Sequence, residues 1–196
     1  TAVPKPREVH VEFDATQTHL LVGQIGIARD DPDYFPLLLG NHVLGGNGVV
    51  SLLFQEIRER RGLSYSVESH FEAMTLPGPF VASLQTRGAQ LDEASALLRA
   101  QIAKFVEHGP TAAALEEARR NLIGGFPLRI DNNAKILENI AAIGFFHLPP
   151  DYLDRQVERL EAVTLEQVRA ALRRHLQPSA MTVVSVGRTP PAAAAP

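Results

Sequence analysis

The alternation of apolar and polar side chains near the start of the chain predicts two β-strands. Residues 9–13 place Val9, Val11 and Phe13 on one face with polar residues between them, which is the period of a strand. After a polar turn, residues 20–28 are more continuously apolar, as is typical of a strand in the interior of a sheet. We therefore expect the chain to open with two strands.

Two helices and two further strands are predicted next. A helix over about 31–46 would begin at an Asp-Pro pair and end at paired glycines. A second helix over about 49–60 has its apolar residues at the spacing of one helix face. Residues 63–73 and 80–87 alternate, and the Leu-Pro-Gly-Pro turn between them predicts an antiparallel, hairpin-like pair.

The remainder of the chain is predicted to be mainly helical, with one last strand. Apolar stripes indicate successive helices from about residue 91 onward. The helix expected over 132–148 carries Ile136, Ile140 and Ile143 as its apolar residues. A Thr-Leu-Glu-Gln capping box indicates the start of the last helix, and residues 180–187 form a final strand.

This order of elements predicts an α+β fold, with an antiparallel β-sheet and helices packed on one of its faces. Residues 8–187 would form a single domain. Residues 1–7 are expected to be a flexible N-terminal segment, and 188–196 a disordered tail rich in proline and alanine. Because the chain starts with Thr1, we expect it to be a processed or truncated product.

Composition excludes several classes of function. The net charge of −3 and the pI near 6.1 argue against a nucleic-acid-binding surface, for which a basic face is usual. No apolar run approaches the ~20 residues that a membrane-spanning helix needs. The absence of cysteine excludes disulfides, thiolate metal sites and thiol nucleophiles.

The spacing of the seven histidines predicts no metal site in this chain. None of them is followed four residues later by a second histidine, the arrangement that places two zinc ligands on one side of a helix. Neither HExxH nor HxxEH occurs. A site assembled from distant histidines has no local support in the sequence.

A glycine-rich stretch, Gly45-Gly46-Asn47-Gly48, stands ahead of the second predicted helix. Exposed amides at such a place could hold an anion. The stretch lacks the Lys-Ser/Thr pair of a P-loop and the spacing of a dinucleotide fingerprint. A helix C-cap followed by a tight reversal is the better explanation.

The corner between the second helix and the following strand carries Arg58 and Tyr65, seven residues apart around Gly62. A basic helix end that complements the helix dipole, followed by an ordinary strand aromatic, accounts for both residues. Alternatively, the short corner lets both side chains converge. A guanidinium and a phenol are both hydrogen-bond donors, suited to a peptide carbonyl or an oxyanion.

Residues 45–67, with the Gly-rich turn, Leu53-Phe54, the basic helix end and Gly62 to Val67, resemble the M16 (pitrilysin-like, mitochondrial-processing-peptidase-like) zinc metallopeptidases. The resemblance is to the C-terminal, non-metal-binding domain and extends over roughly 8–187. It implies the LuxS/MPP-like metallohydrolase fold. In this family a similar domain carries HxxEH, whereas His42 here is followed by neither a glutamate nor a second histidine at those positions.

The resemblance further implies that Arg58 and Tyr65 bind substrate beside a zinc ion carried by an HxxEH-bearing partner domain or subunit. This chain alone would then be inactive and hold no metal or other cofactor. The assembly, a homodimer or a heterodimer, would cleave peptides or unfolded segments. Leu52 stands where many relatives have arginine, which leaves one contact to substrate or partner in doubt.

Two other classes of function stay open. The chain could be a structural scaffold subunit derived from the peptidase fold, although a scaffold has no need of the Arg58–Tyr65 pair. It could also be an anion-binding module that uses Gly45 to Gly48. The resemblance leaves the compartment undetermined and favours the periplasm over the cytoplasm.

Overall fold

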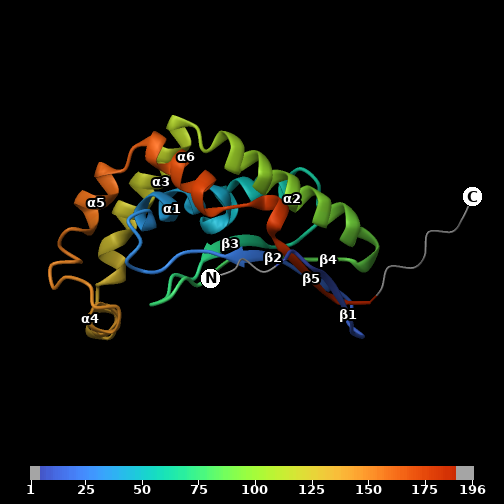
Figure 1. Cartoon of the computed structure of the whole chain (residues 1–196), viewed down its shortest axis with the longest axis horizontal. Helices are drawn as coiled ribbons and strands as arrows, with labels where there is room; N and C mark the ends of the chain where they lie inside the picture. Colours follow the sequence, from blue (N-terminus) through green and yellow to red (C-terminus); the bar gives the residue numbers. More distant parts are fainter. Residues whose placement is uncertain (1–4, 189–196) are drawn as a thin grey trace, which may run out of the picture.

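The computed structural model describes residues 5–188, which form a five-stranded sheet covered on one face by helices (Figure 1). Residues 1–4 and 189–196, which hold most of the predicted flexible segment and tail, lie outside the described residues. The strand order is β1-β5-β2-β4-β3. The strands are β1 (Glu8–Glu12), β2 (Thr18–Ile25), β3 (Val67–Phe71), β4 (Pro79–Thr86) and β5 (Thr182–Gly187). The predicted α+β class is confirmed.

Strand pairing follows the predicted antiparallel pattern except at one edge. β2 pairs with both β4 and β5, and β3 with β4, all antiparallel, whereas β1 runs parallel to β5. The last strand of the chain therefore inserts between the first two. Residues 13–17 are long enough to cross it, because neighbouring strands are ~4.8 Å apart and an extended residue spans ~3.3 Å.

Helices cover the face of the sheet that contains Leu20, Val22 and Phe80, which are almost fully buried. Leu98 and Leu172 pack in the same hydrophobic core from the helical layer. The capping box predicted ahead of the last helix is present, with both of its hydrogen bonds formed. The helices are α1 (Tyr34–Asn41), α2 (Leu91–His108), α3 (Ala112–Gly125), α4 (Asn133–Phe145), α5 (Gln156–Ala162) and α6 (Leu165–His175).

The opposite face of the sheet is open and partly apolar. The predicted apolar residues of the first strand are exposed, with Val9 at 42% and Val11 at 46%. Leu21 and Ile25 of β2 also face outward. Within the described residues, no helix has the length and apolar character needed to cross a bilayer.

The two helices predicted before the corner differ from the prediction in where they begin and in their helix type. α1 begins at Tyr34, later than predicted, and continues as a π-helix, η1 (His42–Gly46). The helix predicted over 49–60 is divided. A short 3-10 turn, η2 (Gly48–Val50), is followed by extended Ser51 and then by a helical segment that includes the π-helix η3 (Phe54–Glu59). Gly48, with φ of +45°, allows this break.

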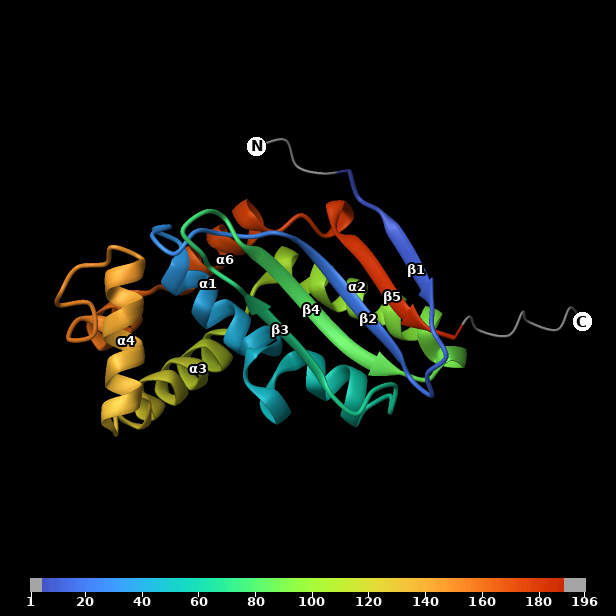
Figure 2. The same ribbon diagram turned by 90° about the horizontal axis from the view of Figure 1, so that it is seen from below.

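The helix predicted over 132–148 is present as α4, but its apolar residues are not buried. α4 lies at the end of the molecule, away from the sheet (Figure 2), and none of its residues is buried. Ile136 and Ile140 are 38% and 55% exposed. The apolar stripe exists, but no described part of the chain covers it completely.

Candidate functional site

The helical segment that contains η3 ends at Gly62, which forms the corner before β3. Gly62 has φ of +62°, a left-handed conformation that glycine adopts without steric cost. Its N–H donates to the Arg58 carbonyl over 2.9 Å, and the Leu63 N–H donates to the Ile57 carbonyl over 3.0 Å. These bonds turn the chain back toward the sheet directly after Arg58.

The structure brings the side chains of Arg58 and Tyr65 together at this corner. The Arg58 guanidinium carbon lies 5.2 Å from the centroid of the Tyr65 ring and 4.7 Å from that of Phe54. Such contacts are within cation–π range. Arg58 Nη1 also donates to Glu59 Oε1 over 2.8 Å. Tyr65 does not belong to β3, contrary to the predicted strand, and is 80% exposed.

The loop that carries Tyr65 is anchored through its neighbours. The buried Ser64 hydroxyl lies within hydrogen-bond distance of the Ser66 and Gln85 carbonyl oxygens, and Thr86 Oγ1 donates to the Leu63 carbonyl over 2.6 Å. The backbone of the loop is therefore fixed to the end of β4, while the Tyr65 ring points into solvent. An exposed side chain on a fixed backbone is well suited to contact a partner.

A hollow of about 350 Å³ lies beside this pair. Sequence reasoning missed Arg87, which adds a second guanidinium to the hollow. The signal was present, because Arg87 ends the strand predicted to pair with the one that contains Tyr65. The lining residues are Gln17, Arg58, Gly62, Leu63, Ser64, Tyr65, Gln85, Thr86, Arg87 and Gln90.

Close packing explains the glycine-rich stretch. A Cβ atom on Gly45 would lie 2.4 Å from Ser69 Oγ, and one on Gly46 would lie 2.8 Å from Asn41 Nδ2. Asn41 and Ser69 form two hydrogen bonds with each other, from Asn41 Nδ2 to the Ser69 carbonyl and from Ser69 Oγ to Asn41 Oδ1. The glycines let η1 approach β3 closely enough for this buried contact.

The residues around His42 do not fit a zinc site. Its Nε2 lies 3.1 Å from Asn121 Oδ1 on α3, and burial lowers the pKa of His42. The one group of three metal-ligating side chains found in residues 5–188 is elsewhere and joins Asp31, Asp33 and His175. There, Asp33 already pairs with His175 Nε2 and with Arg174, so its negative charge has a positively charged partner without a metal ion.

This α+β domain has a guanidinium–phenol pair at an exposed corner, and its sequence contains neither HExxH nor HxxEH. The family model described as "Peptidase M16 inactive domain" matches residues 1–122. The chain therefore belongs to the M16 peptidase family.

Known proteins similar to this chain agree with that assignment. An uncharacterized zinc protease of Streptomyces coelicolor is 31% identical over 157 residues, covering 80% of this chain and 34% of that protein. One of Bacillus subtilis is 28% identical, covering 88% and 43%. The crystal structure of an M16 inactive domain from Pseudomonas fluorescens matches with a TM-score of 0.90 and 41% identity, over 96% of this chain and 45% of that one. The chain thus spans less than half the length of these relatives.

Proposed function

We propose that this chain is the metal-free half of an M16-type zinc peptidase, and that Arg58 and Tyr65 bind the backbone of a peptide substrate. The zinc ion, and the water it activates, would belong to a companion domain or subunit that carries HxxEH. This chain would contribute donors that hold a substrate carbonyl while the companion supplies the metal.

The convergence of Arg58 and Tyr65 at an exposed, anchored corner supports the proposal most directly. The two side chains lie in contact, beside a hollow and next to the end of β4. Stacking on Phe54 restricts the guanidinium, so that less side-chain entropy is lost when it binds a carbonyl oxygen. Arg87 adds positive charge to the same hollow.

The test is reconstitution of peptidase activity with a separately expressed HxxEH-bearing M16 companion. This chain alone, with zinc added, should show no peptidase activity. In the reconstituted assembly, Arg58→Met should lower kcat about 100-fold, the effect of removing one preorganised donor to a developing charge. Tyr65→Phe should lower kcat less, because the ring that contacts Arg58 is kept.

Arg60→Met is the matched control. Arg60 lies in the same basic segment, but its Nη1 pairs with Glu56, and it does not line the hollow. Turnover should be preserved in this variant. Full turnover in both Arg58→Met and Tyr65→Phe would refute the binding role and favour a scaffold function. Peptidase activity of the isolated chain would refute its assignment as the metal-free half.

A further inference from the structure

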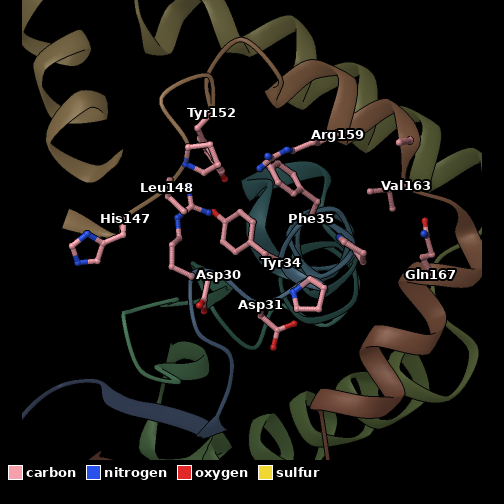
Figure 3. A pocket seen from close by; sticks show the side chains of 15 residues that line it. Asp30, Asp31, Tyr34, Phe35, His147, Leu148, Tyr152, Arg159, Val163 and Gln167 are labelled. Atoms are coloured by element: carbon pink, nitrogen blue, oxygen red, sulfur yellow. The ribbon is translucent and has the colours of Figure 1, made fainter. Parts of the chain in front are cut away.

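A second pocket of about 470 Å³ lies among the loop after β2, the start of α1, the segment before α5 and α5 itself (Figure 3). Its volume is in the range of small-molecule sites. Three aromatic side chains and two arginines line it: Tyr34, Phe35, Tyr152, Arg29 and Arg159. It shares no residue with the hollow beside Arg58.

Aromatic rings hold both guanidinium groups in this pocket. The Arg29 guanidinium carbon lies 3.9 Å from the centroid of the Tyr34 ring and 5.0 Å from that of Tyr152. Arg159 lies 5.1 Å from the Tyr152 ring and 5.8 Å from the Phe35 ring. A guanidinium that contacts an aromatic ring still has N–H groups at its edges, and these can donate to an acceptor that lies in its plane.

The two guanidinium groups of the pocket lack carboxylate partners among the described residues. Neither Arg29 nor Arg159 forms an ion pair with a carboxylate in the part of the chain that the structure describes. The Nη1 atom of Arg29 is buried and has no hydrogen-bond partner among residues 5–188. A buried donor without an acceptor destabilises the protein. An added acceptor is therefore favourable here.

The two acidic residues that line the pocket, Asp30 and Asp31, do not pair with its arginines. Asp31 Oδ1 accepts from the Asp33 N–H over 2.8 Å and lies 3.8 Å from His175. Asp30 is exposed, and Figure 3 shows Asp30 and Asp31 on the other side of the Tyr34 ring from Tyr152 and Arg159. Burial raises the pKa of Tyr152, so its phenol stays neutral and does not repel an anion.

We propose that this pocket binds an organic carboxylate. The carboxylate would lie against the edges of the Arg29 and Arg159 guanidiniums, which match its planar geometry, and an attached apolar group would lie against the aromatic rings. The C-terminus of a peptide and the side chain of an acidic residue both supply this chemistry.

The experiment is a titration of the folded chain, followed by calorimetry, with four probes that separate these sources. N-acetylphenylalanine carries a terminal carboxylate and N-acetylphenylalanine amide carries none. N-acetylglutamic acid α-amide carries its carboxylate on the side chain, and inorganic phosphate is a simple anion. We expect saturable binding of a carboxylate probe, with the phenylalanine amide at least about tenfold weaker than the acid, because a charged hydrogen bond is lost.

Stronger binding of the glutamate probe than of N-acetylphenylalanine would support the site and assign its ligand to acidic side chains. Equal binding of the phenylalanine acid and its amide, with the glutamate probe binding no more tightly than either, would overturn the proposal, as would binding of phosphate without binding of either carboxylate.

Arg159→Met should weaken binding of the preferred carboxylate at least about tenfold. The matched control is Arg155→Met, because Arg155 lies just before the same helix, pairs with Asp151 over 2.7 Å and does not line the pocket. Circular dichroism would show whether both variants fold. If Arg159→Met does not fold, Arg159→Lys keeps the charge without the planar pair of donors and should still weaken binding several-fold. Unchanged affinity in a folded Arg159 variant would overturn the proposal.

Discussion

The molecule combines arginine with aromatic rings in two places that differ in how much protein surrounds them. At the corner, Tyr65 is 80% exposed and the guanidinium of Arg58 lies beside an open hollow. In the pocket, Tyr152 is 5% exposed and the Arg29 guanidinium lies within cation–π range of the Tyr34 and Tyr152 rings. The same chemistry therefore suits an extended polypeptide at the corner and a small group in the pocket.

The two places also depend on different parts of the fold. The corner needs a glycine turn next to Arg58 and hydrogen bonds to the end of β4, which join residues 21 and 23 positions apart. The pocket needs the stacking of Phe35 on Tyr152, which joins α1 to the segment before α5. Substitutions in the pocket should therefore affect stability more than those at the corner.

The largest stability effect is expected for Arg29→Ala. It removes a guanidinium that packs on two rings, and the free energy of unfolding should fall by about 2 kcal/mol. Urea unfolding monitored by circular dichroism would measure this. Arg58→Ala is the comparison, and because Arg58 is partly exposed the change should stay within ~0.5 kcal/mol. Equal losses in the two variants would contradict the contrast between an enclosed and an open site.

A smaller effect is expected for Ser64→Ala, which tests how the corner is anchored. Without the hydroxyl, the Ser66 and Gln85 carbonyls lose a donor in a buried position, and we expect a loss of about 1 kcal/mol. Ser66→Ala is the control, since Ser66 is exposed and its stability should change by less than ~0.5 kcal/mol. If Ser64→Ala were as stable as the control, the anchoring of the Tyr65 loop would need another explanation.

The smallest expected effect is on the pH dependence of the free energy of unfolding. Because burial lowers the pKa of His42 below its ordinary value of 6.5, the unfolded chain takes up a proton at that site at higher pH than the folded chain does. The contribution of His42 to stability is full above about pH 6.5 and falls as the pH decreases toward the folded-state pKa. His42→Gln should reduce the loss of stability between pH 8 and pH 5.

Unfolding in urea at both pH values would measure this difference against the unsubstituted chain. His108→Gln is the matched control, because His108 is exposed at the end of α2 and pairs with Glu107. A reduction of equal size in both variants would show that burial of His42 is not its cause.

The corner could be predicted from the sequence because its determinants are local. Gly62 turns the chain, and Arg58 and Tyr65 are close enough along it that a short turn alone brings them together. Their proposed binding role came from the family resemblance and stays a prediction. The carboxylate pocket was missed because Arg29 and Arg159 are separated by most of the chain, and no periodic pattern joins them.

Helices α4 and α6 show that a local sequence pattern does not predict which helix is buried. α6 is rich in charged residues, yet Val168, Ala171 and Leu172 are fully buried. α4 is more apolar, and none of its residues is buried. Periodicity predicted both helices, but it carries no information about whether another element lies against the apolar stripe.

The sequence by itself determined the type and order of the elements, the capping box and the helix-to-strand corner, because backbone preferences and side-chain periodicity act over a few residues. Only the tertiary structure decided that β5 inserts between β1 and β2, that α4 stands away from the core, and that Arg29 meets Tyr152. Those outcomes depend on which surfaces, far apart in the sequence, pack together. Because the hydrophobic effect is non-directional, a local pattern of apolar residues does not determine which surface will cover it.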